Sequence, residues 1–294
     1  MDSQTESANR AVGWRKFRFP LLIVAMAALM VAAGALNSAL TGLGVLEFAI
    51  GVGTAAAALW GYLRLSRFVE QRPVVAELSP ANARAGALRG MAIGAAAFVA
   101  TMLLVLISGG VDGFSGGSFW GFTATAGLMA SVAVTEELLF RGVLFRIVER
   151  WLGTWGALAL SAILFGVAHL VNPGASLWGA LAIAVEAGLM LGAAYVATRT
   201  LWLPIGLHFA WNLAEGGVFG TTVSGADGES GSLLHTLLSG PNAVTGGAFG
   251  PEASLFAVLV CAVPTVFFLR SAARRGRIVP LRGRQSRSDT RPVR

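Results

Sequence analysis

Residues 133–142 read AVTEELLFRG, an apolar stretch in which two adjacent glutamates, Glu136 and Glu137, precede the arginine Arg141. Apolar residues continue on both sides of this motif, from Ala124 to Val148. Charged side chains inside a bilayer span are costly, and they usually contact a partner or a cavity. The stretch therefore predicts a membrane helix that carries part of a polar site.

The composition of the whole chain agrees with a membrane protein. Of the 294 residues, 55% are hydrophobic and 13% are charged, whereas a soluble domain has about 25% charged residues. An ordinary soluble globule and a disordered chain are both excluded. Because a membrane helix needs roughly 20 apolar residues, we predict an all-α, polytopic transmembrane helix bundle of about eight spans.

The eight apolar runs predicted as spans are Pro20–Leu40, Val45–Leu63, Leu88–Ile107, Ala124–Val148, Trp155–Leu170, Leu177–Ala197, Leu201–Gly217 and Ala253–Leu269. Clusters of Gly, Pro, Asn and Ser separate them, among them 108–118, 172–176 and 241–251. We predict one membrane domain, residues 20–270, with its motifs in 135–212. Residues 1–19 form a cytoplasmic N-terminal segment, and residues 271–294 form a basic cytoplasmic tail.

The basic residues indicate the orientation of the spans. The net charge is +7, but the 22 Lys and Arg residues gather at span edges: Arg10, Arg15, Lys16 and Arg18; Arg64, Arg67, Arg72, Arg84 and Arg89; Arg146 and Arg150; Arg199; and several from Arg270 to Arg294. Such clusters mark cytoplasmic segments and contacts with anionic lipid. We therefore predict both termini in the cytoplasm and a bilayer partner, not nucleic acid. We expect an integral protein of a bacterial plasma membrane.

Two further apolar helices carry polar residues at helical spacing. One contains Phe165 and His169, and another contains His208 and Asn212. Glu137 and Arg141 are four residues apart in the favourable order for an ion pair. Glu136 points about 100° away from Glu137 and has no such partner, which suits a general base.

The spacing of the chain suggests that these groups meet. A hairpin around Gly153 would bring Glu136 and His169, seventeen and sixteen residues from that point, to a similar depth. Each motif alone could serve only as an interhelical hydrogen bond or ion pair, but the three together predict a shared polar site. Glu186 is either an accessory residue of this site or the partner of an arginine such as Arg146. We expect Glu47 and Glu215 to be hydrated at outer span ends, and His235 to lie outside the site.

The order of the motifs, Glu-Glu-x-x-x-Arg, Phe-x-x-x-His and His-x-x-x-Asn on separate helices, resembles the CPBP family of intramembrane proteases. This family includes the CAAX prenyl endopeptidases and bacteriocin-processing or immunity proteins. The resemblance covers about 135–212, and the pair Arg72-Pro73 looks like the cytoplasmic loop of the family.

The resemblance implies an intramembrane endopeptidase that hydrolyses a membrane-associated or hydrophobic, CAAX-like peptide. By this resemblance Glu136 activates water, His169 helps to hold that water, and His208 and Asn212 stabilise the oxyanion. Glu137 and Arg141 would support the first helix, and Phe165 would line the pocket. No cofactor is then required.

Three alternatives follow from the same residues. Two His and one Glu are a catalytic zinc set, so Glu136, His169 and His208 are the metal ligands of a metalloprotease hypothesis, although no His-Glu-x-x-His motif is present. A second hypothesis is a non-proteolytic scaffold or immunity protein of the same fold. A third is a transporter that uses the buried Glu and His residues as a proton relay; the lack of an internal repeat counts against it.

Overall fold

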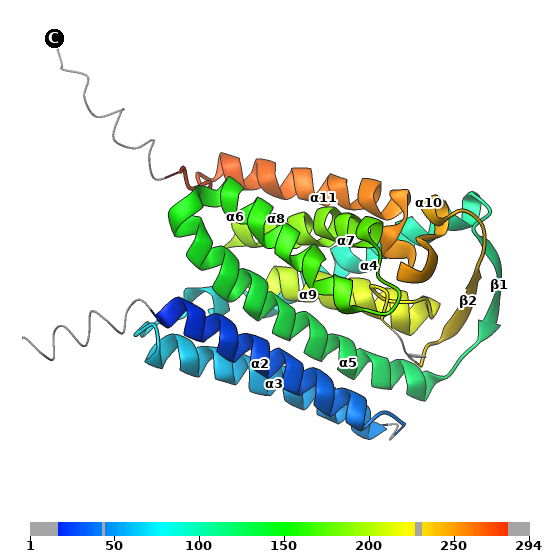
Figure 1. Cartoon of the computed structure of the whole chain (residues 1–294), viewed down its shortest axis with the longest axis horizontal. Coiled ribbons are helices and arrows are strands. Elements are labelled where there is room, and N and C mark those ends of the chain that lie inside the picture. The colour runs from blue at the N-terminus through cyan, green and yellow to red at the C-terminus, as the bar shows by residue number, and fades with distance from the viewer. Residues whose placement is uncertain (1–16, 43–44, 227–230, 282–294) are drawn as a thin grey trace, which may run out of the picture.

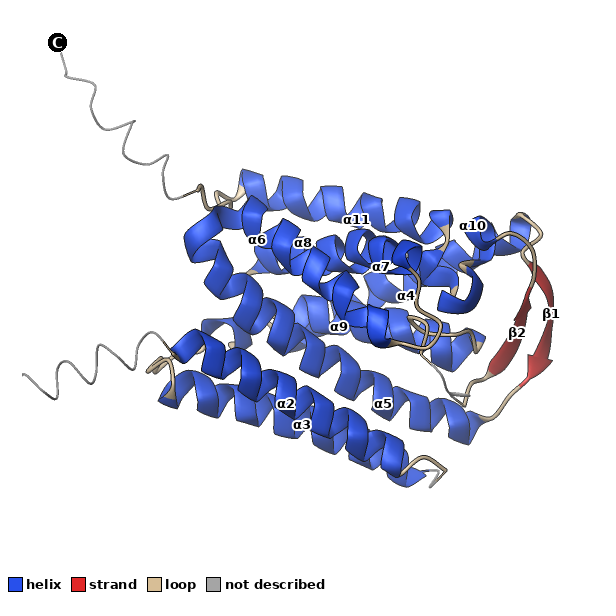
Figure 2. Cartoon of the chain, in the orientation of Figure 1, coloured by secondary structure: helices blue, strands red, loops and turns tan. Residues whose placement is uncertain are grey.

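The chain folds into a bundle of helices with one small sheet, as the computed structural model shows (Figure 2). The structure describes residues 17–42, 45–226 and 231–281. The segments that carry Arg10, Arg15, Lys16, Trp14, Asp227, Glu229 and most of the predicted tail lie outside these residues. The long helices are α2 (Arg18–Ala39), α3 (Val45–Phe68), α4 (Ala83–Ile107), α5 (Phe119–Glu137), α6 (Arg146–Ala168), α7 (Leu177–Ile183), α8 (Met190–Thr198), α9 (Trp202–Asn212) and α11 (Leu255–Arg274).

Six helical runs within the described residues are long and apolar enough to cross a membrane. This confirms the prediction of a helical membrane protein, whereas eight crossings and the orientation of the termini stay predictions. Two of the eight predicted spans belong to one run of 53 residues, Phe119–Val171. The run predicted as Leu201–Gly217 is a continuous helix, α9 with the π-helix Leu213–Phe219, but it is not among the six.

A turn at Gly153 divides the run of 53 residues into two arms. Gly153 has φ 67° and ψ 178°, outside the helical region, and positive φ costs glycine little because it has no Cβ. The arms fold back on each other, so that the rings of Phe140 and Phe165 lie 5.0 Å apart in an edge-to-face contact. The predicted hairpin around Gly153 is therefore confirmed.

Three segments of π-helix interrupt the regular helices beside the predicted motifs. They are Leu138–Phe145 after α5, Ala184–Leu189 between α7 and α8, and Leu213–Phe219 after α9. Such wide turns are rare and are frequent at functional sites. The helix Leu177–Thr198 that contains the second one is the most enclosed of the six candidate spans, with 83% of its apolar window buried, and it forms the centre of the bundle.

The outer edge of the bundle carries a two-stranded antiparallel sheet that the sequence did not predict. Strand β1 (Val111–Gly116) pairs with β2 (Leu234–Leu238), and Figure 1 shows the pair at the end of the bundle opposite to the two chain ends. Both strands lie in segments expected to be loops. They are short, and apolar residues do not alternate regularly with polar ones in either sequence, VDGFSG or LHTLL, so no period-two sequence pattern marks them.

Close backbone contact holds α9 against α4. A Cβ built on Gly94 would lie 2.2 Å from the carbonyl oxygen of Leu207, and one on Gly206 would lie 2.2 Å from the carbonyl oxygen of Ala87. Small residues allow membrane helices to approach in this way. The contact fixes the turn of α9 that carries His208.

We predict that Gly94→Ala destabilises the protein by about 1–3 kcal/mol, because the added methyl group forces α4 and α9 apart. Gly53→Ala is the matched control, since a Cβ on Gly53 meets nothing within 4 Å. Thermal unfolding of the detergent-solubilised full chain measures both. Equal unfolding temperatures of the two variants would show that the α4–α9 contact is not tight.

Candidate functional site

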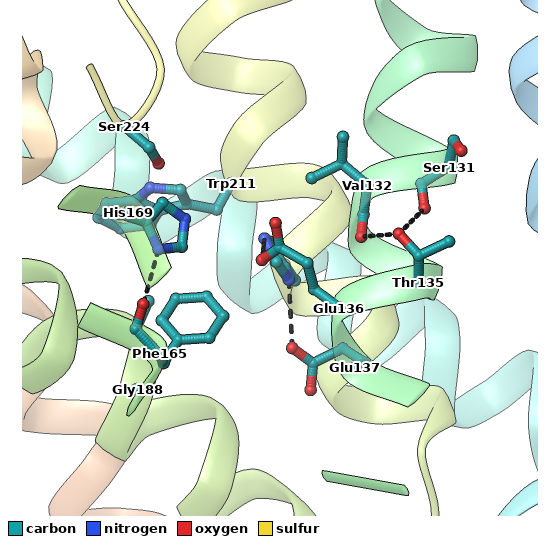
Figure 3. Close-up of polar contacts among 12 residues, drawn as sticks. Ser131, Val132, Thr135, Glu136, Glu137, Phe165, His169, Gly188, Trp211 and Ser224 are labelled. Atoms are coloured by element: carbon teal, nitrogen blue, oxygen red, sulfur yellow. Dashed lines mark hydrogen bonds and ion pairs between the residues drawn. The ribbon is translucent and has the colours of Figure 1, made fainter. Parts of the chain in front are cut away.

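The seven predicted site residues come together in the interior of the bundle. Glu136 and Glu137 end α5, and His208 and Asn212 lie on α9. On the returning arm of the hairpin, Phe165 lies in the last turn of α6, and His169 begins the 3-10 helix that follows it. Arg141 follows one turn after the glutamates in the adjoining π-helix. Figure 3 shows Glu136 between His169 on one side and Glu137 on the other.

Arg141 and Glu137 form the buried ion pair that their spacing predicts. Arg141 Nη1 donates to Glu137 Oε1 at 2.6 Å, and both side chains are 0% exposed. Arg141 Nη2 donates to the carbonyl oxygens of Ala187 at 3.3 Å and Gly188 at 3.1 Å. The guanidinium thus connects the α5 arm to the π-helix of the central helix, and this satisfies most of its donors.

The same carboxylate orients His208. His208 Nδ1 lies 3.2 Å from Glu137 Oε1, which directs its other nitrogen towards Glu136, with Nε2 and Glu136 Oε2 3.9 Å apart. Glu137 therefore serves two partners, one on its own helix and one on α9. These contacts agree with the expectation that Glu137 pairs with Arg141.

Glu136 differs from Glu137 in both exposure and contacts. Its side chain is 16% exposed and lines the interior cavity, yet its Oε2 atom is buried and has no hydrogen bond to any part of the chain that the structure describes. A buried acceptor without a partner is unusual in folded proteins. Glu137 Oε2 is likewise buried without a partner among the described residues, but of the two glutamates only Glu136 lines the cavity.

His169 is held by the last turn of its own helix. Its Nδ1 lies 2.8 Å from the carbonyl oxygen of Phe165, and because a carbonyl only accepts, Nδ1 is the protonated nitrogen. The lone pair of the neutral ring is then on Nε2. The ring of Phe165 lies 4.8 Å from that of His169 and 4.7 Å below the Arg141 guanidinium, so it walls the site as predicted.

The cavity in front of these groups has a volume of about 310 Å³. Asn212 lines it, is 4% exposed, and makes no side-chain hydrogen bond within the described ranges. A second hollow of about 410 Å³ lies beside α2. Residues common to both include Leu128, Val132, Glu136, His169 and Asn172. Glu136, the candidate base, therefore lines both the cavity and the second hollow.

Two sequence-based expectations about other acidic residues are corrected here. Glu215 is 0% exposed and not hydrated, because the segment after α9 folds back: Thr221 donates to the Glu215 carbonyl oxygen, and Gly250 lies against its carboxylate. Glu186 does not pair with Arg146, which bonds to Glu70 and lies close to Glu77. Glu186 instead lines the cavity, as the accessory-residue alternative predicts.

Glu252 is a cavity residue that the sequence analysis missed. It follows Pro251 in a segment predicted as a turn, yet it is 2% exposed and lines the cavity. The signal that could have identified it is an acidic residue only a few positions before an apolar helix. His235 bonds to Ser232 in the outer sheet and does not line the cavity.

No group of three or more His, Cys, Asp or Glu side chains in the described parts of the chain is arranged to hold a metal ion. This applies to Glu136, His169 and His208, the set of the zinc hypothesis. Glu136 Oε2 and His208 Nε2 lie 3.9 Å apart, whereas His169 Nδ1 is engaged by the carbonyl oxygen of Phe165. The arrangement does not fit a preformed zinc site, and no chemical step below involves one.

Apolar helices that surround a cavity lined by carboxyl, imidazole and amide groups define an integral membrane protein with a polar interior site. Residues 117–214 match the model of the family described as type II CAAX prenyl endopeptidase Rce1-like. The matched segment contains all three motifs and confirms the resemblance to CAAX proteases found in the sequence. Neither a curated protein nor a solved structure was found to match the chain.

We predict that Glu137→Gln destabilises the folded protein by about 3 kcal/mol or more, because it leaves the buried Arg141 charge without its counter-ion. Glu136→Gln is the matched control, since it is isosteric and removes no hydrogen bond within the described structure. Thermal unfolding of both variants in detergent tests this. A similar loss in both would mean that the two glutamates share one structural role.

Proposed function

We propose that the protein is an intramembrane endopeptidase that hydrolyses a peptide bond in a membrane-associated or hydrophobic substrate. The observation that carries this proposal is the unpartnered oxygen of Glu136, which lies 3.9 Å from His208 Nε2 and shares a cavity with His169 and Asn212. The family match supports a protease of the CAAX type.

In the proposed reaction Glu136 is the general base. A water molecule between Glu136 and the Nε2 lone pair of His169 loses a proton to the carboxylate as its oxygen attacks the scissile carbonyl carbon. The carbonyl π electrons move to its oxygen, which becomes the oxyanion. The proton on Glu136 is then passed to the leaving nitrogen as the carbon–nitrogen bond breaks.

His208 and Asn212 stabilise the oxyanion. They stand four residues apart on α9, so that Nε2 of the imidazole and the amide nitrogen lie on one stripe of the helix. Donation from Nδ1 to Glu137 and from Nε2 to the oxyanion requires the doubly protonated ring. Donors fixed in advance toward the developing charge are a large source of catalysis.

The second hollow supports a hydrophobic substrate. It is bounded by α2 on one side and by the α5–α6 hairpin on the other, and its apolar residues include Met30, Val31, Phe140 and Val171. It reaches Glu136 and His169 at its inner end. We propose that a peptide segment enters from the bilayer by this route and not from water.

The distribution of charged contacts supports cytoplasmic termini. Arg72 pairs with Glu77, Arg146 with Glu70, and Arg199 with Glu149, while Arg199 also donates to the carbonyl oxygen of Arg277. These contacts gather the basic residues at the end of the bundle where both described chain ends lie (Figure 1). By the positive-inside rule this end faces the cytoplasm, in keeping with a bacterial plasma membrane.

We predict that Glu136→Gln abolishes proteolysis while membrane insertion and folded yield stay unchanged, because the change keeps the shape and removes the base. Substrates are identified by sequencing protein N-termini in membranes of two cell populations, one with the wild-type chain and one with Glu136→Gln. N-termini that appear only with the wild-type chain mark cleavage sites. The exposed Asp112→Asn substitution on β1 is the charge-removal control. Identical cleavage products with wild type and Glu136→Gln would favour a non-proteolytic scaffold.

We predict that Asn212→Ala lowers turnover about a hundredfold or more, with KM nearly unchanged, because it removes an oxyanion donor worth on the order of 3 kcal/mol. A substrate identified by the N-terminal comparison is the probe, in detergent with and without a chelator. Activity should survive chelation. Loss of activity on chelation, restoration by stoichiometric zinc and a small effect of Asn212→Ala would favour the zinc alternative.

A further inference from the structure

The cavity has a second group of acidic residues that the proposed hydrolysis does not use. Glu186 on the central helix and Glu252 before α11 both line it, and their residues are 1% and 2% exposed. Glu215 lies behind them, and is fully buried. We call Glu186 and Glu252 the acidic wall. It faces the same space of about 310 Å³ as Glu136, His169 and Asn212.

The acidic wall has no basic partner. Glu70, Glu77, Glu137 and Glu149 each form an ion pair with an arginine, whereas no Arg, Lys or His nitrogen among the described residues lies within salt-bridge distance of Glu186, Glu215 or Glu252. The contrast is the more notable because these three are among the most deeply buried acids of the chain.

Neutral hydrogen-bond donors hold Glu186 and Glu252 in place, but one oxygen of Glu186 has no hydrogen-bond partner among the described residues. Glu252 accepts hydrogen bonds from Trp211 Nε1 at 2.9 Å and from Ser224 Oγ at 2.6 Å. Glu186 Oε2 lies 3.4 Å from Cys261 Sγ, while Glu186 Oε1 is buried and unpartnered. An acceptor that lacks a partner on the wall of a cavity is a binding group for whatever enters that cavity.

Burial determines which ligand suits this wall. An isolated carboxylate in a low-dielectric interior needs a compensating charge, either a proton or a cation. A metal ion is disfavoured, since no set of three or more acidic, His or Cys side chains in the described structure has metal-binding geometry. A guanidinium or ammonium group needs only one or two carboxylates and forms strong charge-assisted hydrogen bonds with them.

We propose that Glu186 and Glu252 form a subsite for the side chain of a lysine or arginine that adjoins the scissile bond of the substrate. The proposal rests on the proposed proteolytic function and names its substrate class. A cavity near the lower end of the range of ligand pockets has room for one or two residues of a peptide. The cationic side chain would occupy the wall while the scissile carbonyl lies between Glu136 and Asn212.

The same wall disfavours a free C-terminal carboxylate. Arg141 is the arginine nearest to the site, but it is fully buried, engaged by Glu137 and two carbonyl oxygens, and not part of the cavity lining. A substrate tail that ends in the cavity would bring its negative charge toward two further carboxylates. Within this proposal, the acidic wall therefore favours a basic side chain over a free carboxylate in the space beside Glu186 and Glu252.

A binding experiment tests the wall without reference to proteolysis. The probes are n-butylguanidinium and its neutral isostere n-butylurea, titrated into the detergent-solubilised full chain while the unfolding temperature is followed. We expect stabilisation by the cation and little by the urea. Glu186→Gln and Glu252→Gln should each weaken cation binding about tenfold or more, as for loss of a charge-assisted hydrogen bond, whereas Asp112→Asn should not.

The same titration has outcomes that overturn the proposal. Equal stabilisation by n-butylguanidinium and n-butylurea in the wild-type chain would do so, even if a Gln variant fails to fold. So would cation binding that is lost in Glu136→Gln and kept in Glu186→Gln, because the cation would then occupy the proposed catalytic centre.

A cleavage experiment separates this proposal from the proteolytic function. Peptide pairs derived from a cleaved substrate, identical except for Lys or Gln beside the scissile bond, are compared in proteoliposomes. We expect kcat/KM to favour Lys about tenfold or more, and Glu186→Gln to remove the preference while Gln peptides are still cleaved. Cleavage without a preference overturns the subsite alone. Cation binding without any cleavage leaves the subsite and overturns the protease.

Discussion

The arrangement of the whole site depends on one fully buried charge, the guanidinium of Arg141. A cation in the interior of a helix bundle needs a counter-charge and hydrogen-bond acceptors for its donors. Glu137 supplies the counter-charge, and the carbonyl oxygens of Ala187 and Gly188 supply further acceptors. These acceptors belong to a π-helix, whose wider turn leaves backbone oxygens free to bond outside their own helix. The central helix and the α5 arm are thereby held in one register.

The ion pair between Arg141 and Glu137 also distinguishes the contacts of Glu137 from those of Glu136. Glu137 is occupied by Arg141 and His208, so its charge is neutralised from two sides. Glu136, one residue earlier, points to the cavity and keeps an unpartnered oxygen. Two adjacent residues of the same type therefore differ in their contacts, because the helix directs them about 100° apart and only Glu137 meets the Arg141 guanidinium. Replacing Arg141 by a neutral or acidic residue would remove the counter-charge of Glu137. It would thereby change the environment of both glutamates.

The sequence predicts this part of the site well because the information is local. The i,i+4 pairs Glu137–Arg141 and His208–Asn212 follow from helix periodicity, and the meeting of Phe140 and Phe165 follows from the turn at Gly153. What the sequence could not predict depends on long-range packing. Glu215 is buried by a segment that returns from far along the chain, Glu252 lies in an irregular stretch, and β1 and β2 pair across more than a hundred residues. The π-helices are equally hidden, since no spacing of residue types in the sequence marks them.

The distribution of charge around the cavity links mechanism to specificity. On one wall, Arg141 compensates Glu137, and His208 lies between the two motif glutamates. On the other wall, Glu186 and Glu252 are held only by neutral donors.

A bilayer is a poor solvent for every one of these groups, so an uncompensated acidic wall costs folding free energy. Partly satisfied polar groups are tolerated in proteins chiefly at functional sites. A substrate cation that replaces this missing charge would be bound most strongly when water is excluded from the cavity. The apolar route beside α2 and the acidic wall thus favour the same kind of peptide, one that is hydrophobic along most of its length and basic at one residue.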